Sequence, residues 1–588
     1  MTGDLAMKRR SYIIWIIFGI SFIFHILISD FPKTMLVYSD ELRYISIARS
    51  IREGLIRVHN LPSDYQKILY SICIAPALAF RSPSMQVRAV SWLNSLYVSS
   101  AVFPVYLLAS KICSKHRQAL IVALFAGFGP ATMLSMTYMS EVVFIPLSLW
   151  LMVIAYTLIM ERKLSKKVAK ACAFGVLCYL SYLNKEIALY FLISFILVTS
   201  VKAFKDKENR KQEVISVFVV LLVFLVCFVI AKSTLFKGMG NSYNQMGIRE
   251  LLNYEHIRFM AYAFICDSFF AVLAFGIFPV VIVVHDMFFE RNSVNYFRSF
   301  VVLSWMIGVI TIVYTITVRE DFGAADLRQH IRYLEPLMYL FLAFWISAFD
   351  SVAGIKQKAR WPFLTVLFLA FIPMIGRVGA GAPVDNQSLQ YYNYLIDRIN
   401  RFTGHEYGLL IIKCSIAILI VIWWLWTIKA KESSKIGFII LFICIGLGNN
   451  WITYCNLHKL YSISKNEQYE MEQFAEQIRS LSGNILHISP HGLEHDNRMI
   501  DTYIDRDIYV TCLEDSKMEE VCQDGVIDLE HEMVYSEFPG IGYSDLKQVN
   551  YIVADDSITL KNVQKVDGQW AGLNLYVNLD PDKIIVCQ

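Results

Sequence analysis

The feature that most constrains this chain is a succession of apolar runs, each long enough to cross a lipid bilayer. A spanning helix needs about 20 mainly apolar residues. We expect thirteen spans, at 11–29, 88–111, 118–136, 139–160, 168–184, 187–204, 213–232, 259–285, 299–318, 333–350, 361–376, 408–428 and 436–455. The 588 residues are 56% hydrophobic and 18% charged, whereas soluble domains are about 45–50% apolar and about 25% charged. The sequence predicts a polytopic α-helical membrane protein, and excludes a disordered chain, a secreted disulfide scaffold and an ordinary cytosolic enzyme.

The distribution of charge predicts the orientation in the membrane. The loops that follow the even-numbered spans carry clusters of lysine and arginine, for example at 111–117, 161–167 and 202–211. Basic short loops stay in the cytoplasm, so we expect a cytoplasmic N-terminus and an extracytoplasmic C-terminal region in the plasma (inner) membrane. The bases are scattered between apolar spans, which argues against nucleic acid as a partner.

The C-terminal region differs from the rest in composition. Residues 458–588 hold 24 acidic and 10 basic side chains, while the remainder holds 26 acidic and 44 basic ones. Helical periodicity at 466–481 precedes short strand-like runs at 484–489, 508–512, 551–554 and 573–577. We therefore predict a transmembrane domain over 1–457, with a first extracytoplasmic loop at 30–87, and a small extracytoplasmic α/β domain over 458–588. Within that domain the spacing of Cys512 and Cys522 leaves a disulfide open.

An acidic pair, Asp40 and Glu41, follows the first span. Apolar residues recur every three or four positions over 42–55, which predicts an amphipathic helix on the membrane face that ends near Gly54. With Ser39 as N-cap, both carboxylates lie at the positive end of the helix and stay ionised. They could provide a general base at the bilayer edge, or only complement the helix dipole; the residues alone leave both interpretations open.

Three further charged residues lie at expected span ends. Lys67 precedes the apolar run 68–80, which is too short to span comfortably and which we interpret as interfacial or re-entrant. Its ammonium group could pair with a phosphate or snorkel to the interface. Glu141 opens one span, and Lys185 joins two others. These two could contact a substrate, or Glu141 could be a helix-end charge and Lys185 could pair with the adjacent Glu186.

The segment before the tenth span is unusually basic for its expected extracytoplasmic side. Arg328 and Arg332 are four residues apart, so a helix would place both on one face. Guanidinium groups suit phosphate oxygens, which favours an anionic ligand. Local pairing with Asp321, Asp326 or Glu335 is the alternative.

Together these residues resemble the GT-C glycosyltransferases, and among them the protein O-mannosyltransferase and lipid A aminoarabinose transferase group. The resemblance covers about 11–340 and is carried by residues in the family's order: Asp40-Glu41-x-x-Tyr44, Lys67-Ile68-Leu69-Tyr70, Arg88, Glu141 and Arg332-Tyr333-x-x-Pro336. The family's Lys-Pro-Pro-like re-entry lacks its prolines here. Thirteen spans before an extracytoplasmic domain also resemble the aminoarabinose transferase architecture.

The resemblance implies an enzyme that transfers a sugar from a polyprenyl-phosphate donor to a hydroxyl of a lipid, glycan or protein acceptor, with inversion. It implies Asp40 as the catalytic base, because Asp40 matches the family's acidic position. Glu41 points about 100° away around the helix, so the two cannot both face the same proton. The residues expected at the donor phosphate are Lys67, Arg328, Arg332 and Tyr333. Further substrate contacts are expected at Tyr44, Glu141 and Lys185.

One short distance and one absence follow from this resemblance. Lys67 and Arg332 should approach one another if both hold one phosphate. Because cations can stabilise the leaving phosphate, and the first loop has no DxD-type ligand set, we predict no cofactor, while a divalent metal stays open. Membrane lipids are the other expected partners.

Other classes of membrane protein also fit part of this pattern. A transporter or lipid flippase would need many spans and internal charges, but internal repeats and matched broken helices are typical of transporters, and the sequence has neither. An O-antigen ligase or polymerase would also use lipid-linked sugars, but its critical bases belong in a large late loop, and the loop 377–407 is modest. A degenerate relative whose C-terminal region is a binding module is the third alternative.

Overall fold

The computed structural model describes most of the chain, in two units. The described residues are 2–33, 39–62, 67–234, 253–289, 294–319, 330–348, 366, 369–377, 386–429, 434–490, 504, 506, 508–514, 516–521, 526–536, 542–570 and 572–587. Their contacts group 1–29 with 94–457, and 30–93 with 458–588. The loop that the sequence analysis assigned to the transmembrane domain thus has most of its contacts within the second unit, and each unit is described by itself.

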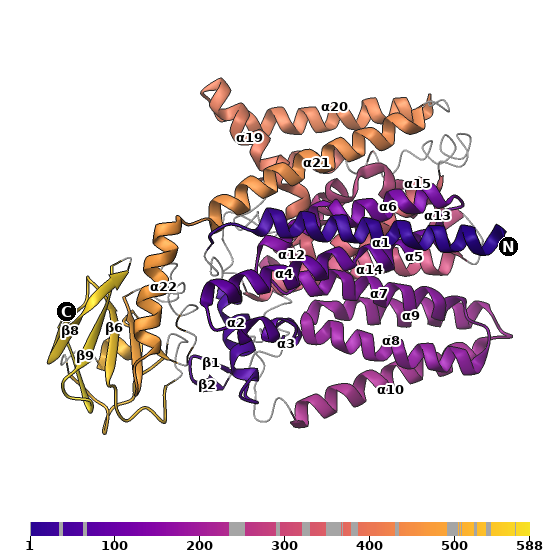
Figure 1. The fold of residues 1–588 in the computed structure, drawn as a ribbon. Coiled ribbons are helices and arrows are strands. Elements are labelled where there is room, and N and C mark those ends of the chain that lie inside the picture. The colour runs from indigo at the N-terminus through magenta and orange to yellow at the C-terminus, as the bar shows by residue number, and fades with distance from the viewer. Residues whose placement is uncertain are drawn as a thin grey trace. The chain divides into compact units, whose positions relative to one another are not determined.

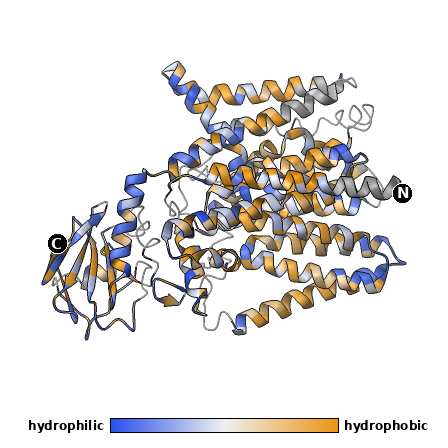
Figure 2. Cartoon of the chain, in the orientation of Figure 1, coloured by the Kyte–Doolittle hydropathy of each residue, from blue (hydrophilic) through white to orange (hydrophobic). Residues whose placement is uncertain are grey.

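The first unit is a bundle of helices (Figure 1). Its α-helices are α1 (Thr2–Ser29), the end of α4 (Pro83–Ser100), α5 (Val102–Ile112), α6 (His116–Phe128), α7 (Glu141–Met160), α8 (Leu164–Asn184), α9 (Leu189–Lys205), α10 (Arg210–Thr234), α12 (Tyr254–Phe275), α13 (Ile277–Phe289), α14 (Val294–Arg319), α15 (Glu335–Ala348), α19 (Gln390–Thr403), α20 (Gly408–Ile428) and most of α21 (Ser434–Tyr461). Short 3₁₀ helices lie at Pro130–Met136 (η2), Glu186–Ala188 (η3), Ile331–Tyr333 (η4), Ile372–Met374 (η5) and Gln387–Leu389 (η6). Most of their length is apolar (Figure 2).

The number of membrane spans differs from the expectation. Among the described residues, eight helical segments are long and apolar enough to cross a membrane, so the predicted count of thirteen is not confirmed. Two expected spans contain only shorter apolar helices, Glu335–Ala348 and Gly408–Ile422. The expected span 259–285 is divided at Gly276, whose φ of 88° separates α12 from α13. Most of the expected span 361–376 lies outside the described residues. The predicted class, a polytopic helical membrane protein with a small C-terminal sheet domain, is confirmed.

Close packing of α8 against α10 depends on a small residue. At Gly175 of α8 an added Cβ would lie 2.9 Å from the carbonyl oxygen of Val220 in α10. Lys167 near the start of α8 and Glu213 near the start of α10 form an ion pair, so α8 and α10 run parallel and start at the same end of the bundle (Figure 1). Glycine is therefore required where the two backbones approach.

The second unit begins with the segment after α1. Helix α2 (Ser39–Ile51) starts with Asp40 and Glu41 in its first turn, and the chain turns at Gly54 with a φ of 76°. This confirms the predicted helix, while its place on the membrane face stays a prediction. A short hairpin, β1 (Arg57–Val58) and β2 (Leu61–Pro62), precedes α3 (Leu69–Ile74) and η1 (Ala75–Ala79). The start of α4 completes this segment.

The C-terminal residues form a five-stranded sheet and a three-stranded sheet with helix α22. The strands are β3 (Ile485–Ser489), β4 (Tyr509–Cys512), β5 (Val526–Asp528), β6 (Tyr551–Asp555), β7 (Thr559–Lys561), β8 (Val563–Trp570), β9 (Leu573–Asn578) and β10 (Lys583–Cys587); the helices are α22 (Lys465–Arg479) and α24 (Ser516–Val521). The larger sheet has the order β4-β3-β6-β9-β8, in which β3 is parallel to β4 and β6, and β9 is antiparallel to its neighbours. The smaller sheet, β5-β10-β7, is antiparallel.

The predicted helix and four predicted strands of this region are confirmed as α22, β3, β4, β6 and β9. A capping box between Ser464 and Glu467 starts α22. Leu61 of the first loop belongs to the same apolar core as Leu486 and Ile552 of the sheet, which explains why loop and sheet form one unit. Cys512 is buried as a free thiol, and Cys522 lies outside the described residues, so the disulfide stays untested.

Candidate functional site

Three charged side chains that the sequence singled out separately meet inside the first unit. Glu141 begins α7, Lys185 follows α8, and Arg332 lies in η4. One carboxylate oxygen of Glu141, Oε1, lies 3.2 Å from Lys185 Nζ and 2.9 Å from Arg332 Nε. All three side chains are at most 5% exposed. Because two cations share one carboxylate, this buried triad carries a formal charge of +1.

Hydrogen bonds between helix ends bring the triad together. Asn184 Nδ2 donates to the carbonyl oxygen of Ser140 over 2.9 Å, which joins the end of α8 to the start of α7. The hydroxyl of Tyr190 in α9 donates to the carbonyl oxygen of Tyr333 over 3.0 Å. The first bond holds the segment of Lys185 close to Glu141, and the second holds the segment of Arg332 against α9.

Tyr333 contacts both cations of the triad. Its ring centroid lies 5.3 Å from Lys185 Nζ and 5.0 Å from Arg332 Cζ, within the range of cation–π attraction. Its hydroxyl also accepts a hydrogen bond from Arg332 Nη2 at 3.0 Å. The expected group of Glu141, Lys185, Arg332 and Tyr333 is thus assembled in space, whereas Arg328 lies outside the described residues.

A second buried carboxylate, Glu335, lies one helical turn beyond Arg332, and the sequence reasoning did not propose it as a site residue. Its Oε1 accepts hydrogen bonds from the hydroxyl and the backbone N–H of Ser388, at 2.6 and 3.3 Å. The backbone N–H of Ile331 donates to Asn386 Oδ1 at 3.0 Å. These partners are more than fifty residues away along the chain and leave no local signal in the sequence.

The two carboxylates of the acidic pair have different surroundings in the second unit. Glu41 is fully buried, and its Oε1 accepts a 2.6 Å hydrogen bond from the hydroxyl of Tyr461. The side chain of Asp40 is 34% exposed and lies 3.9 Å from Arg43. Of the two, Asp40 has the access to solvent that a base acting on a substrate requires.

Lys33 is a buried cation close to this pair. It forms an isolated antiparallel bridge with Ser462, and its Nζ lies 5.2 Å from the centroid of the Phe31 ring. Burial lowers the pKa of Lys33 to about 7, although the charges of Asp30 and Glu41 act in the opposite direction. The sequence contains no periodic or motif signal for this residue, because its partners come from both ends of the chain.

Two other expected site residues lie in the second unit. Lys67 is buried immediately before α3. Tyr44 is fully buried, with its ring packed edge-on against Tyr70 at 5.2 Å between centroids, so in this structure it packs α2 against α3. The expected approach of Lys67 to Arg332 joins two units and stays a prediction.

Within the described part of the chain, no cluster of three His, Cys, Asp or Glu side chains could hold a metal ion. The expectation of an enzyme without a cofactor stays a prediction. What the described residues offer instead is cationic: Lys185 and Arg332 beside Glu141 could stabilise negative charge that develops on a ligand.

Comparisons with known proteins support the fold. ArnT from Cupriavidus metallidurans, solved with undecaprenyl phosphate, matches with a TM-score of 0.51 and 11% identity over 98% of each chain. The apo form of that protein matches with a TM-score of 0.49 and 11% identity, again over 98% of each chain. The oligosaccharyltransferase of Archaeoglobus fulgidus, in complex with Zn and sulfate, matches with a TM-score of 0.39 and 12% identity, over 92% of this chain and 68% of that one. No protein-family model and no curated protein matches the sequence.

Only the first of these similarities carries weight, and it concerns the fold. It extends over the helical bundle and the C-terminal sheets alike, since 98% of both chains is covered. The fold that the resemblance implied is thereby confirmed: the chain has the fold of ArnT from Cupriavidus metallidurans.

Proposed function

We propose that this protein is an integral membrane glycosyltransferase that transfers a sugar from a polyprenyl-phosphate donor to an acceptor hydroxyl on the extracytoplasmic side. The observation that carries the proposal is the likeness in fold to ArnT over 98% of both chains. That relative was solved with undecaprenyl phosphate, which is the type of lipid carrier that we propose for this chain. The buried cations of the first unit are of the kind that can stabilise a leaving phosphate, and the partly exposed Asp40 of the second unit is of the kind that can accept a proton.

In the proposed reaction the acceptor oxygen attacks the anomeric carbon of the sugar. A glycosidic C–O bond forms, and the bond between the anomeric carbon and the phosphate oxygen breaks. The polyprenyl phosphate leaves with the bonding electron pair, and the acceptor proton passes to Asp40. Attack opposite the leaving group inverts the anomeric centre.

The surroundings of Asp40 and Glu41 support this division of roles. Asp40 is partly exposed and can accept a proton from a substrate, whereas Glu41 is buried and bonded to Tyr461. A buried carboxylate that accepts a charge-assisted hydrogen bond holds its partner in place. We therefore assign Asp40 to catalysis, and Glu41 to positioning the start of α2.

The leaving group gains negative charge as the reaction proceeds, and cations must stabilise it. Arg332 and Lys185 have a net positive balance with Glu141, so the triad favours an anion. Lys67 is a further candidate for stabilising the leaving phosphate.

The proposal is tested by measuring transfer of a radiolabelled sugar from polyprenyl-phosphate donors into a membrane extract. Asp40→Asn should reduce the rate about 10²–10⁴-fold, as expected for loss of a general base, while expression and thermal unfolding stay near those of the wild type. Glu41→Gln is the matched control, since it removes the neighbouring charge and keeps an acceptor for Tyr461. Transfer by Asp40→Asn within a few-fold of wild type would show that Asp40 is only a helix-end charge.

A further inference from the structure

The ends of four neighbouring helices meet at one end of the first unit. Helix α7 ends at Met160 and α8 begins at Leu164, while α9 ends at Lys205 and α10 begins at Arg210. These helix ends and their two connections form the hydrophilic tip of an otherwise apolar group of helices (Figure 2). This end of the helices lies far from Glu141 and Lys185, which are at the opposite ends of α7 and α8.

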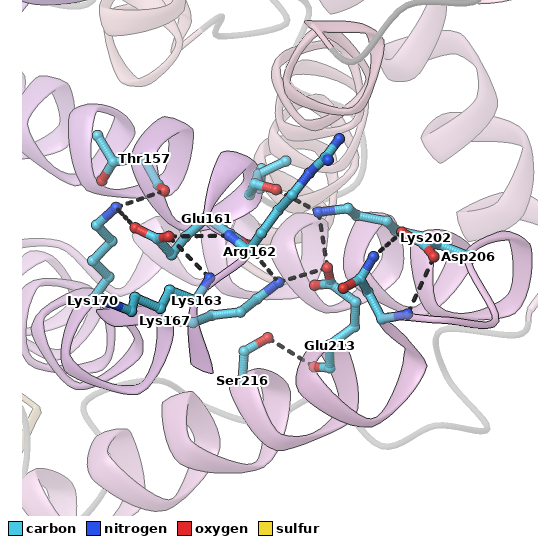
Figure 3. A network of polar contacts seen from close by, with 12 residues as sticks. Thr157, Glu161, Arg162, Lys163, Lys167, Lys170, Lys202, Asp206, Glu213 and Ser216 are labelled. Carbon is cyan, nitrogen blue, oxygen red and sulfur yellow. Dashed lines mark hydrogen bonds and ion pairs between the residues drawn. The ribbon is translucent and has the colours of Figure 1, made fainter. Parts of the chain in front are cut away.

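A buried ion-pair network fixes these helix ends (Figure 3). Glu213 of α10 is 2% exposed, and its Oε1 lies 2.5 Å from Lys167 Nζ of α8 and 2.8 Å from Lys202 Nζ of α9. Three residues further along α8, Lys170 Nζ bonds to Glu161 Oε2 at 2.6 Å, and this hydrogen bond lowers the pKa of Glu161 to about 2. The network joins the ends of α7, α8, α9 and α10, and its three lysines and two glutamates leave a formal charge of +1.

Seven other bases at this end point to solvent, and we call them the basic end: Arg162, Lys163, Lys166, Lys205, Lys207, Arg210 and Lys211. Over the two segments 161–170 and 202–213 there are ten bases and four acids. Two of those acids, Glu161 and Glu213, are already bonded to lysines of the network. The basic end therefore has a strong uncompensated positive charge.

The position of these bases is unfavourable for the helices themselves. Lys166 lies in the first turn of α8, and Arg210 and Lys211 lie in the first turn of α10. A helix N-terminus carries partial positive charge, so cations there are repelled. Because α8 and α10 run parallel, both N-termini add to the positive potential of the basic end, which an external anion would relieve.

An exposed apolar stripe begins directly at the basic end. On α10, Arg210 is followed at helical spacing by the exposed residues Val214, Phe218, Leu221 and Leu225. Residues spaced by three or four lie on one face of a helix. A ligand that covers both features must carry an anionic group next to a hydrocarbon chain about as long as half a membrane-spanning helix.

We propose that the basic end and the exposed face of α10 form a binding site for an anionic phospholipid. The phosphate-containing headgroup lies against Arg210, Lys211 and Lys205, and an acyl chain lies along the apolar stripe. Juxtamembrane bases attract anionic lipid headgroups, and the lipid is favoured over a free phosphate because the stripe adds apolar contact. The buried network fixes the helix ends, so the site is formed before the lipid arrives.

The test uses the full-length protein in detergent, titrated with phosphatidylglycerol, with bound lipid counted by native mass spectrometry. Phosphatidylcholine with the same acyl chains and inorganic phosphate are the two comparison ligands. The double variant Arg210→Gln/Lys211→Gln should weaken phosphatidylglycerol binding about tenfold or more, since each base near an anionic surface contributes about a fivefold factor. Phosphatidylcholine should bind more weakly to the wild type and be unaffected by the variant.

A matched control removes the same charge elsewhere. Lys111→Gln/Arg117→Gln alters two exposed bases of the α5–α6 connection, of which Arg117 is also in the first turn of a helix. This variant should bind phosphatidylglycerol as the wild type does. If both double variants lost phosphatidylglycerol binding equally, the lipid would be attracted to bases in general, and the proposed site would be wrong. The site would also be wrong if neither variant lost binding. Displacement of the lipid by millimolar inorganic phosphate would overturn the lipid as occupant.

Discussion

The buried triad of Glu141, Lys185 and Arg332 predicts unequal costs for removing its members. Glu141→Gln leaves two buried cations without their shared carboxylate, so the local charge rises to +2. Lys185→Met leaves the 2.9 Å pair between Glu141 and Arg332 in place, so the local charge falls to zero. The first variant should be strongly destabilised, and the second much less.

The magnitude follows from the burial of all three side chains. Removing one partner of a buried ion pair costs about 3–5 kcal/mol, because an uncompensated charge remains. We expect a value in this range for Glu141→Gln and about 1–2 kcal/mol for Lys185→Met, which loses packing and one charge-assisted hydrogen bond. The double variant Glu141→Gln/Lys185→Met should be more stable than Glu141→Gln alone, because it leaves one buried cation in the triad where Glu141→Gln leaves two.

The measurement is thermal unfolding of the purified variants in one detergent, with Glu186→Gln as the control. Glu186 is adjacent to Lys185 and only partly buried, so its loss should cost less than about 1 kcal/mol. If the polyprenyl phosphate binds at the triad, adding it should also stabilise Glu141→Gln more than the wild type, because its phosphate replaces the missing carboxylate. Equal destabilisation by Glu141→Gln and Lys185→Met, or a Glu141→Gln variant no less stable than the Glu186→Gln control, would refute this reasoning.

Three further predictions concern other parts of the chain. Tyr461→Phe removes the hydrogen bond to buried Glu41 and should cost about 1.5–3 kcal/mol, seen as faster hydrogen exchange in α2; unchanged exchange would contradict it. Because the pKa of Lys33 is lowered to about 7 from 10.5, the unfolded chain binds the extra proton between these values, so stability should rise with pH there. Lys33→Met should then exceed the wild type in stability at pH 7, and lose that advantage by roughly 1.4 kcal/mol per pH unit above it; a constant difference would argue against the shift. Gly175→Leu should destabilise the contact of α8 with Val220 by about 1–3 kcal/mol or more, whereas Gly19→Leu, where an added Cβ meets nothing within 4 Å, should be tolerated.

Much of the fold could be predicted from the sequence, because local patterns determine it. The apolar runs produced helices in the membrane region, the periodicity after Ser39 produced α2, and the short strand-like runs produced β3, β4, β6 and β9. Strand β8 and strand β10 were not predicted. In β8 most side chains are exposed and polar, so it has no apolar alternation to detect. The span count is not confirmed, and Gly276 divides one expected span into two helices.

The candidate site could be predicted only residue by residue. Glu141, Lys185 and Arg332 were each singled out as a charge at the boundary of an apolar run. For each of them the sequence also allowed a purely structural role, as a helix-end charge or in a local ion pair. Their convergence depends on long-range bonds such as that between Asn184 and Ser140. Tyr461 and Lys33 were missed entirely, because their contacts, Tyr461 with Glu41 and Lys33 with Ser462, join residues hundreds of positions apart.

The central claim is that sugar leaves a polyprenyl phosphate and becomes bonded to an acceptor on this protein. The most direct measurement follows both products at once, using a donor with one label in the sugar and another in the polyprenyl chain, with the purified protein in vesicles that contain acceptor extract. The account predicts equal amounts of labelled acceptor and free polyprenyl phosphate, and loss of both with Asp40→Asn. Intact donor appearing on the opposite side of the vesicle membrane, with no labelled acceptor formed, would instead identify a flippase and contradict the proposed function.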